Sequence, residues 1–116
     1  MALKSIAFIM YPVTDMPRAV AFYECLGLLK TGIDQPFWVE FDVAGATFGV
    51  GNFEQVGKAG TAQSLALEVA DLPAFRAQLA GHGIQASAPH ELAHCTISVV
   101  SDPDGNQIWL HQLKAG

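Results

Sequence analysis

The chain contains an internal repeat, and this repeat restricts the possible folds more than any other feature. The segment VTDMPRAVAFYECLGL, residues 13–28, aligns without gaps on VADLPAFRAQLAGHGI, residues 69–84, at a constant offset of 56. The matched positions include the pairs Val13/Val69, Asp15/Asp71, Met16/Leu72, Pro17/Pro73, Ala21/Ala77, Gly27/Gly83 and Leu28/Ile84. This match predicts that one structural unit occurs twice in the chain.

Each copy is predicted to contain a strand followed by a helix. An Asp can cap the start of the helix, a Pro in the first turn lacks an N–H group that would be unpaired there, and a Gly ends the helix. In the first copy, apolar residues recur at helical spacing at Ala19, Phe22, Tyr23 and Leu26. The second copy keeps Leu72, Phe75 and Leu79. The preceding segments, SIAFIMYPV (5–13) and SLALEV (64–69), are expected to form strands.

Each helix is followed by a segment typical of a β-hairpin. Residues 36–53 predict two strands around the turn VAGA, and residues 95–113 predict two strands around DPDGN, whose Asp-Pro and Asp-Gly steps favour turns. The hairpins correspond at an offset of 60, which pairs Asp42 with Asp102 and Gly45 with Gly105. The second copy therefore has four extra residues, which we place between its helix and its hairpin. Each half is predicted to run strand–helix–strand–strand, with one more short strand before the hairpin.

The extra residues coincide with PHELAH, residues 89–94, which contains the spacing H-E-x-x-H. On a helix this spacing places two histidines on one face as zinc ligands, with the glutamate beside them as general base. Here Pro89 precedes the motif and the β-branched run TISVV begins two residues after it, which leaves room for about one helical turn. We therefore interpret PHELAH as a loop and expect no zinc-protease site at His90 and His94.

Length and composition limit the classes of function. A chain of 116 residues is expected to form a single domain, with repeat one at about residues 1–56 and repeat two at about 57–116. Apolar residues make up 51% of the chain and charged residues 15%, which favours an apolar pocket or subunit interface, and we expect a homodimer. The net charge is −5 and no run of Lys or Arg occurs, so no nucleic-acid partner is expected.

The N-terminus and the cysteines bear on location. The N-terminal apolar run is too short to span a membrane and has no small-residue cleavage site, so we expect no membrane partner. Cys25 and Cys95 lie far apart and form no C-x-x-C motif. The expected interpretation is two reduced thiols in a cytoplasmic protein.

Three segments, VTDMPRAVAFYECLGL, LALEVADL and SDPDGNQIWLHQ, together resemble the vicinal-oxygen-chelate superfamily in their order and spacing. This superfamily contains glyoxalase I, extradiol dioxygenases and the fosfomycin- and bleomycin-resistance proteins. The resemblance covers nearly the whole chain. It implies an α+β fold in which two βαβββ repeats form a curved mixed sheet around a shared cavity, often completed in a homodimer.

The metal-dependent members of that superfamily place His or Glu on four strands, where a divalent ion binds two adjacent oxygens of a substrate. Carried over by motif, one position lies seven residues before the Asp that begins the first helix, which is Phe8, and its repeat mate is Ser64. Another lies four residues after the Gly of DPDG, which is Trp109, and its repeat mate is near Gly49. Phe, Gly and Trp side chains are not metal ligands and one Ser hydroxyl is weak, so we expect no metal and no other cofactor.

The resemblance and this departure from its metal pattern together predict a protein that binds a small molecule in an apolar, aromatic cavity. Phe8 and Trp109 suit stacking on a flat or apolar ligand. Met10 shares the strand face of Phe8, and His111 shares that of Trp109, where it could hydrogen-bond or transfer a proton near neutral pH. The predicted ligand-binding residues are Phe8, Met10, Ser64, Trp109 and His111. Glu68 could share the face of Ser64 but is expected at a rim, while the facing of Tyr11 and Trp38 is not predicted.

Two alternatives remain open. One is a small-metabolite enzyme of the same superfamily, lyase-like or dioxygenase-like, that uses non-standard residues. For this alternative no catalytic residue is predicted, and metal-dependent glyoxalase or dioxygenase activity is disfavoured. The other is a structural dimer in which Phe8 and Trp109 fill the cavity as core residues.

Overall fold

The computed structural model describes residues 2–115 and contains the predicted unit twice. The first copy, module 1, consists of β1 (Ile9–Pro12), α1 (Met16–Cys25), β2 (Leu29–Gln35), β3 (Trp38–Val43) and β4 (Ala46–Gly51). A short 3-10 helix, η1 (Glu54–Val56), follows it. The second copy, module 2, consists of β5 (Leu65–Glu68), α2 (Leu72–Gly81), β6 (His90–Glu91), β7 (Cys95–Ser101) and β8 (Gln107–Leu113). The α+β class and the βαβββ order of each half are confirmed.

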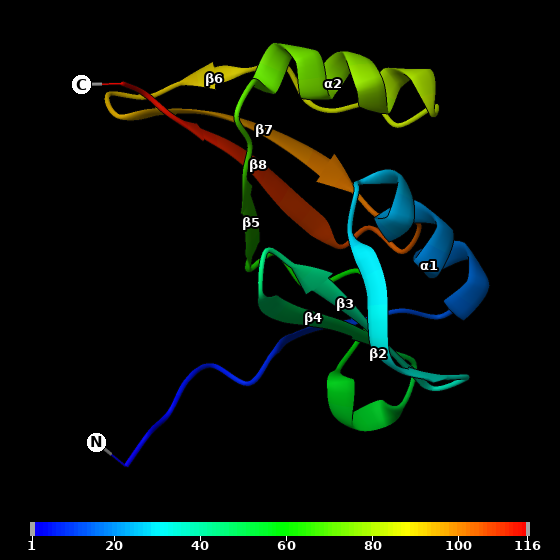
Figure 1. Cartoon of the computed structure of the whole chain (residues 1–116). Coiled ribbons are helices and arrows are strands. Elements are labelled where there is room, and N and C mark those ends of the chain that lie inside the picture. Colours follow the sequence, from blue (N-terminus) through cyan, green and yellow to red (C-terminus); the bar gives the residue numbers. More distant parts are fainter. Residues whose placement is uncertain (1, 116) are drawn as a thin grey trace.

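Each module forms its own four-stranded mixed sheet (Figure 1). The strand orders are β1-β4-β3-β2 and β5-β8-β7-β6, so the first strand of each module lies at one edge. In both sheets the first strand pairs parallel to the last strand of its module, while the other pairs are antiparallel. Within the described residues the two sheets remain separate, and neither closes into a barrel.

The strand register identifies equivalent positions in the two modules. Ile9 of β1 pairs with Phe48, and Leu65 of β5 pairs with Ile108. Since Ile9 and Leu65 are related by the repeat offset of 56, β4 and β8 are related by the offset of 60. Gly49 and Trp109 therefore occupy equivalent places, as the sequence alignment predicts.

The hairpin register refines the position of the four extra residues. Trp38 pairs with Gly51, and Ile97 pairs with His111, so β3 and β7 are related by an offset of 59. Three of the extra residues thus precede β7, and the fourth lengthens the turn between β7 and β8. The prediction placed all four before the hairpin, because the turn residues DPDGN alone do not show where the ladder ends.

The helix boundaries agree with the predicted caps. The Oδ1 atom of Asp15 accepts a hydrogen bond of 3.1 Å from the backbone N–H of Arg18 at the start of α1. Asp71 caps α2 in the same way through the N–H of Ala74, at 3.0 Å. Gly27 and Gly83 follow the two helices with φ angles of 99° and 76°, which L-residues rarely adopt.

One hydrophobic core receives side chains from both modules. The predicted apolar faces of the helices are buried in it, with Tyr23 and Leu79 almost fully enclosed. From the sheets it receives alternate residues, including Val39, Phe41, Phe48, Val50, Leu65, Leu67, Ile108 and Leu110. Since successive residues of a strand point to opposite sides, each sheet has one face in this core and one face open to the outside.

Polar contacts join the turn between β7 and β8 to module 1. The hydroxyl of Tyr23 donates a 2.7 Å hydrogen bond to Oδ2 of buried Asp102. The Oδ1 atom of Asp102 accepts from the backbone N–H groups of Asp104 and Asn106, each at 2.9 Å. Asn106, which is fully buried, donates through Nδ2 to the carbonyl of Pro12 at 2.7 Å. The turn therefore fixes one module against the other.

Tyr11 makes a second link between the modules. Its hydroxyl donates to the carbonyl of Gln107 and accepts from the N–H of Leu65, both at 2.7 Å. Burial raises the pKa of this hydroxyl and, more strongly, the pKa of the Tyr23 hydroxyl, since a phenolate is poorly solvated there. We refer to Tyr11, Tyr23, Asp102 and Asn106 as the inter-module cluster.

The structure differs from the sequence prediction in the lengths of some strands. Residues 5–8 were predicted as part of the first strand, but β1 begins at Ile9, where its pairing with Phe48 of β4 starts. In Figure 1 this N-terminal segment runs away from the body. The extra strand before each hairpin is confirmed, with seven residues in β2 and two in β6. No helix in the described part of the chain is long and apolar enough to cross a membrane.

Candidate ligand-binding site

The open face of the first sheet carries aromatic side chains. We define the first open face by Phe8, Met10, Trp38, Glu40 and Gly49, which alternate with the core residues of their strands. Phe8 and Met10 are 44% and 40% exposed, as expected for side chains that point away from the core. The predicted placement of these two residues on one face is thus supported by the pairing of β1 with β4.

Trp38 covers the centre of the first open face. A Cβ atom built at Gly49 would lie 2.3 Å from Cζ2 of Trp38, so the indole occupies the space that any side chain at Gly49 would need. The ring of Phe8 lies edge-on to this indole at a centroid distance of 5.2 Å. Phe53, just after β4, lies 6.1 Å from the indole and 6.4 Å from Phe37. The result is an aromatic surface of four rings.

One polar group accompanies these rings. The indole Nε1–H of Trp38 donates a 2.9 Å hydrogen bond to Oε2 of Glu40, which lies on the same face two residues later. This contact fixes the orientation of the indole ring and leaves the rest of the carboxylate available. A planar ligand with one polar edge matches this combination of surface and acceptor.

The open face of the second sheet is more polar. We define the second open face by Ser64, Ala66, Glu68, Trp109 and His111. Ala66 pairs with Trp109 and Glu68 pairs with His111, which confirms that Trp109 and His111 share a face. Trp109 is 38% exposed and Ser64 is exposed, whereas His111 is partly covered.

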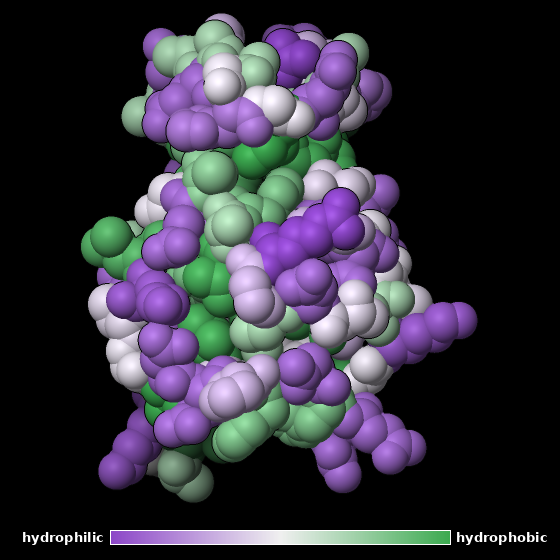
Figure 2. Space-filling view, turned by 90° about the vertical axis from the view of Figure 1, so that its right-hand side faces the viewer, coloured by the Kyte–Doolittle hydropathy of each residue, from purple (hydrophilic) through white to green (hydrophobic). Residues whose placement is uncertain are grey.

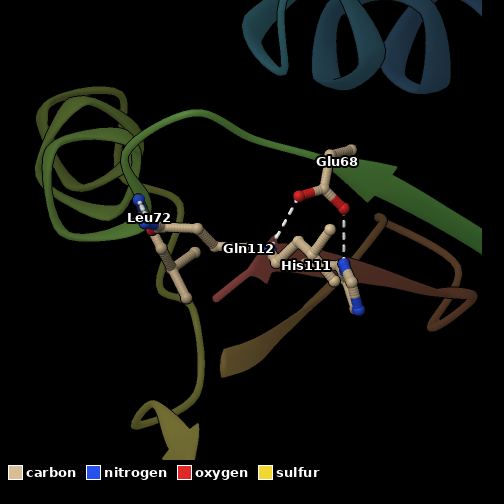
Figure 3. Close-up of polar contacts among 5 residues, drawn as sticks. Glu68, Leu72, His111 and Gln112 are labelled. Atoms are coloured by element: carbon tan, nitrogen blue, oxygen red, sulfur yellow. Dashed lines mark hydrogen bonds and ion pairs between the residues drawn. The ribbon is translucent and has the colours of Figure 1, made fainter. Parts of the chain in front are cut away.

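Glu68 and His111 form a close pair on this face (Figure 3). Oε1 of Glu68 lies 2.5 Å from Nδ1 of His111, and Oε2 accepts a 2.7 Å hydrogen bond from the backbone N–H of Leu113. The Leu113 N–H and the His111 side chain lower the pKa of the Glu68 carboxyl below its ordinary value, since both stabilise the carboxylate. Glu68 is therefore a partner of a predicted site residue.

In the superfamily that the sequence resembles, the metal-dependent members hold the ion at four positions. The residues at the matching positions of this chain do not fit a metal ion. Phe8 and Trp109 present rings, Gly49 lies under Trp38, and Ser64 offers a single hydroxyl. In residues 2–115 no three His, Cys, Asp or Glu side chains lie close enough together to hold an ion. The expectation of metal-independent function remains a prediction.

The PHELAH segment forms a strand and a turn. His90 and Glu91 form β6, so their side chains leave opposite sides of the strand, and His94 lies in the turn before β7. Glu91 instead pairs with Nζ of Lys114 at 2.7 Å and accepts from the hydroxyl of Thr96 at 3.2 Å. The segment is therefore in part a short strand rather than the predicted loop, and it lacks the helical face that the zinc-protease arrangement requires.

Among the hollows on the described part of the molecule, two are lined by residues of both modules. One, of about 640 Å³, lies between the modules and is lined in part by Ile9, Phe48, Leu67 and Phe75. The other, of about 680 Å³, lies between α1 and residues 83–88. Figure 2 shows apolar surface gathered in a waist between the upper and lower parts of the molecule. The five predicted ligand-binding residues line neither hollow and lie on the open faces instead.

Some residues of these faces were not predicted. The side of the sheet on which Trp38 lies was not predicted, and Glu68 was expected at a rim. Phe37 and Phe53 were not predicted as site residues. The available signal was the alternation of β3, where Val39 and Phe41 are apolar core residues and Trp38 and Glu40 fall between them. This alternation does not reveal contacts across strands, so the Glu68–His111 pair had no comparable signal.

Comparison with known proteins gives two kinds of match. The family model of the Glyoxalase/Bleomycin resistance protein/Dioxygenase superfamily matches residues 5–110. No curated protein sequence matches the chain. Many solved structures resemble it, and three are informative.

The structure of TnmS3, an antibiotic binding protein from Streptomyces sp. CB03234, is similar at 28% identity and a TM-score of 0.86, with 98% of this chain and 99% of that chain covered. A glyoxalase/bleomycin resistance protein from the same organism is 29% identical at a TM-score of 0.78, with 93% and 100% covered. Lactoylglutathione lyase from Agrobacterium tumefaciens shares the fold at a TM-score of 0.81 and 15% identity, with 97% and 96% covered.

Proposed function

Since the chain belongs to the Glyoxalase/Bleomycin resistance protein/Dioxygenase superfamily, we propose that it binds a small, partly apolar or aromatic molecule without the metal that other members use. The ligand stacks on Phe8 and Trp38 of the first open face and on Trp109 of the second. Met10 adds apolar contact, and Ser64 and His111 provide hydrogen bonds. Phe37 and Phe53 extend the aromatic surface.

One feature carries this proposal: aromatic rings occupy positions that the resemblance to the superfamily assigns to metal ligands. Phe8 and Trp109 stand at two of these positions, and Trp38 fills the volume above Gly49. Phe8 and Trp109 are 44% and 38% exposed, whereas Trp38 is 8% exposed and core rings such as Phe41 and Phe48 are almost fully buried. The partial exposure of Phe8 and Trp109 suits a ligand better than it suits a filled core, which argues against the structural-dimer alternative.

The comparison with TnmS3 supports the same function. That protein is described as an antibiotic binding protein, and at 28% identity over nearly the full length of both chains it resembles this one in more than general architecture. We infer that the ligand is a drug-sized molecule. We also infer a cytoplasmic location, because Cys25 and Cys95 are both free.

We propose that the functional unit is a homodimer. Both sheets bury one face in a common core, so their open faces look outward and a second copy is needed to enclose a ligand between two such faces. The edge strands β1 and β5 border the apolar hollow between the modules. Leu3 and Ile6, in the segment before β1, are 80% and 81% exposed and lack contacts suited to their apolar side chains.

If the protein is a dimer, light scattering at micromolar concentration should give the mass of two chains. The interface between the two copies should bury at least about 1,000 Å² of surface in total. Replacing Leu3 and Ile6 together by Asp should shift the protein toward monomer. The control is Leu92→Asp, an apolar position that is 42% exposed in the turn after β6, which should leave the mass unchanged. A monomeric wild-type protein contradicts the proposal.

Ligand binding is tested by NMR with a panel of planar aromatic fragments, on protein purified without chelator or affinity tag and checked for metal by elemental analysis. We expect fragments to shift the indole N–H signals of Trp38 or Trp109 in metal-free protein. Trp109→Ala should weaken their binding about tenfold, because it removes the stacking surface. Stoichiometric zinc, nickel, iron or manganese, or the absence of any fragment binding to the open faces, refutes the proposed function.

The enzyme alternative is favoured by one feature, the Glu68–His111 pair. A histidine oriented by a carboxylate can act as a general base toward a bound substrate. Turnover of a bound ligand that is lost in His111→Gln, with binding retained, would establish this alternative. Binding without chemical change in the ligand supports the binding function.

A further inference from the structure

Both oxygens of Glu68 are committed within the second open face. Oε2 accepts from the backbone N–H of Leu113 at 2.7 Å, and Oε1 lies 2.5 Å from Nδ1 of His111. The lowered pKa of Glu68 keeps it ionised near neutral pH, and an ionised carboxylate can only accept hydrogen bonds. Nδ1 of His111 must therefore carry a proton.

The tautomer of His111 follows from this contact. In a neutral imidazole with its proton on Nδ1, the other nitrogen, Nε2, has a free lone pair and acts only as an acceptor. In Figure 3 the second ring nitrogen points away from Glu68. The second open face thus presents an acceptor whose character is set by Glu68.

The surroundings of this acceptor are apolar on one side. Trp109 lies two residues before His111 on the same face, about 7 Å away along the strand. Ile97 is paired with His111 across the hairpin, and Ala66 is paired with Trp109. An aromatic molecule stacked on Trp109 can therefore reach Nε2 with a substituent on its ring.

Resting on the proposed function, we propose that Trp109, His111 and Glu68 form a subsite for an aromatic molecule that bears a hydroxyl group, a phenol or a naphthol. The ring stacks on Trp109 and the hydroxyl donates its hydrogen to Nε2 of His111. Glu68 is a positioning residue, because it acts on the ligand only through His111. The subsite therefore binds ligands whose ring substituent donates a hydrogen bond more tightly than ligands whose substituent can only accept one.

The first test compares three ligands on one ring system: 2-naphthol, 2-methoxynaphthalene and 2-acetylnaphthalene. Binding is followed by NMR at about pH 8.5, and the ¹⁵N chemical shifts of the His111 ring nitrogens report which of them carries a proton. We expect 2-naphthol to bind about tenfold more tightly than the other two, since only it can donate to Nε2. Shifted signals of Trp109 and His111 assign the binding to this subsite.

The second test is Glu68→Gln, which should exchange the tautomer of His111. The amide oxygen of the substituted side chain must face the Leu113 N–H, which needs an acceptor, so the amide NH₂ faces Nδ1. Nδ1 then becomes the acceptor and Nε2 carries the proton. We expect the preference to reverse, with 2-acetylnaphthalene now binding more tightly than 2-naphthol, and the ¹⁵N chemical shifts of the two ring nitrogens to exchange. A residue with a merely structural role would weaken all three ligands alike.

The matched control is Glu91→Gln, which removes the same charge from an exposed, hydrogen-bonded glutamate elsewhere in module 2. It should leave the preference for 2-naphthol and the His111 shifts unchanged. If the three ligands bind wild-type protein equally, or if Glu68→Gln leaves their order unchanged, the subsite is wrong while aromatic binding stands. If none of the three binds, both the subsite and the proposed function are refuted.

Discussion

Each open face carries one tryptophan, but the two come from different strands of the repeat. In module 1 the indole of Trp38 extends from β3 across a glycine of β4, whereas in module 2 Trp109 stands on β8 itself, at the place of that glycine. The first face adds the rings of Phe8 and Phe53. The second face adds the Glu68–His111 pair instead. Two copies of one unit have thus produced an aromatic surface and a mixed, polar one.

The buried faces have diverged much less. Helix caps, the glycines after the helices and the apolar character of the core positions recur in both modules, because each serves the same packing. The side chains on the open faces meet no such constraint. The comparison indicates that the repeat maintains a scaffold, and the residues proposed to bind a ligand are among those that differ between the modules.

The largest expected effect concerns Asp102, which the sequence aligns with Asp42. Asp102→Ala leaves the buried hydroxyl of Tyr23 and one N–H of the Asn106 amide without an acceptor and should cost about 3 kcal/mol of folding stability. Asp42→Ala removes only one exposed contact, to the N–H of Gly45, and should cost less than about 1 kcal/mol. Urea unfolding of both variants measures the difference. If both variants lose the same folding stability, the hydrogen bonds of the inter-module cluster do not make module 2 different from module 1.

An intermediate effect is expected at the contact between Gly49 and Trp38. Gly49→Ala forces the indole aside and should destabilise the protein by about 1–3 kcal/mol. In a Trp38→Ala background the same substitution should be nearly neutral, so a double-mutant cycle gives a large coupling energy. No coupling would mean that Trp38 does not depend on the glycine, and the two faces would then be more alike than described.

The smallest effect concerns acid stability. Because the folded pKa of Glu68 lies below its ordinary value, the carboxylate stabilises the fold at neutral pH, and this contribution is lost as pH falls below about 4.5 through the folded pKa. Glu68→Gln should therefore reduce the difference between the urea midpoints at about pH 7 and about pH 3.5 by a small amount. Glu91→Gln should act in the same direction, since Lys114 and Thr96 lower the pKa of that carboxyl. An unchanged pH dependence in both variants contradicts this assignment.

The fold was predictable because its signals are local and occur twice. Asp15, Pro17 and Gly27 define one helix by chemistry within a few residues, and their repeat mates confirm it. The candidate site was predictable only in part. Alternation along one strand places Trp109 with His111, but Trp38 above Gly49 and Glu68 beside His111 depend on strand register, which no nearby residues specify.

The inter-module cluster also makes the two modules structurally different, so that their order along the chain matters. The turn of module 2 reaches into module 1 through Asp102 and Asn106, whereas the short Ala44–Gly45 turn of module 1 offers no comparable side chains in return. The two halves are therefore no longer interchangeable. A chain built from two copies of module 1 would lack the acceptor for Tyr23, and one built from two copies of module 2 would lack both Tyr11 and Tyr23. The two modules thus form an ordered pair, in which each supplies polar groups that the other lacks.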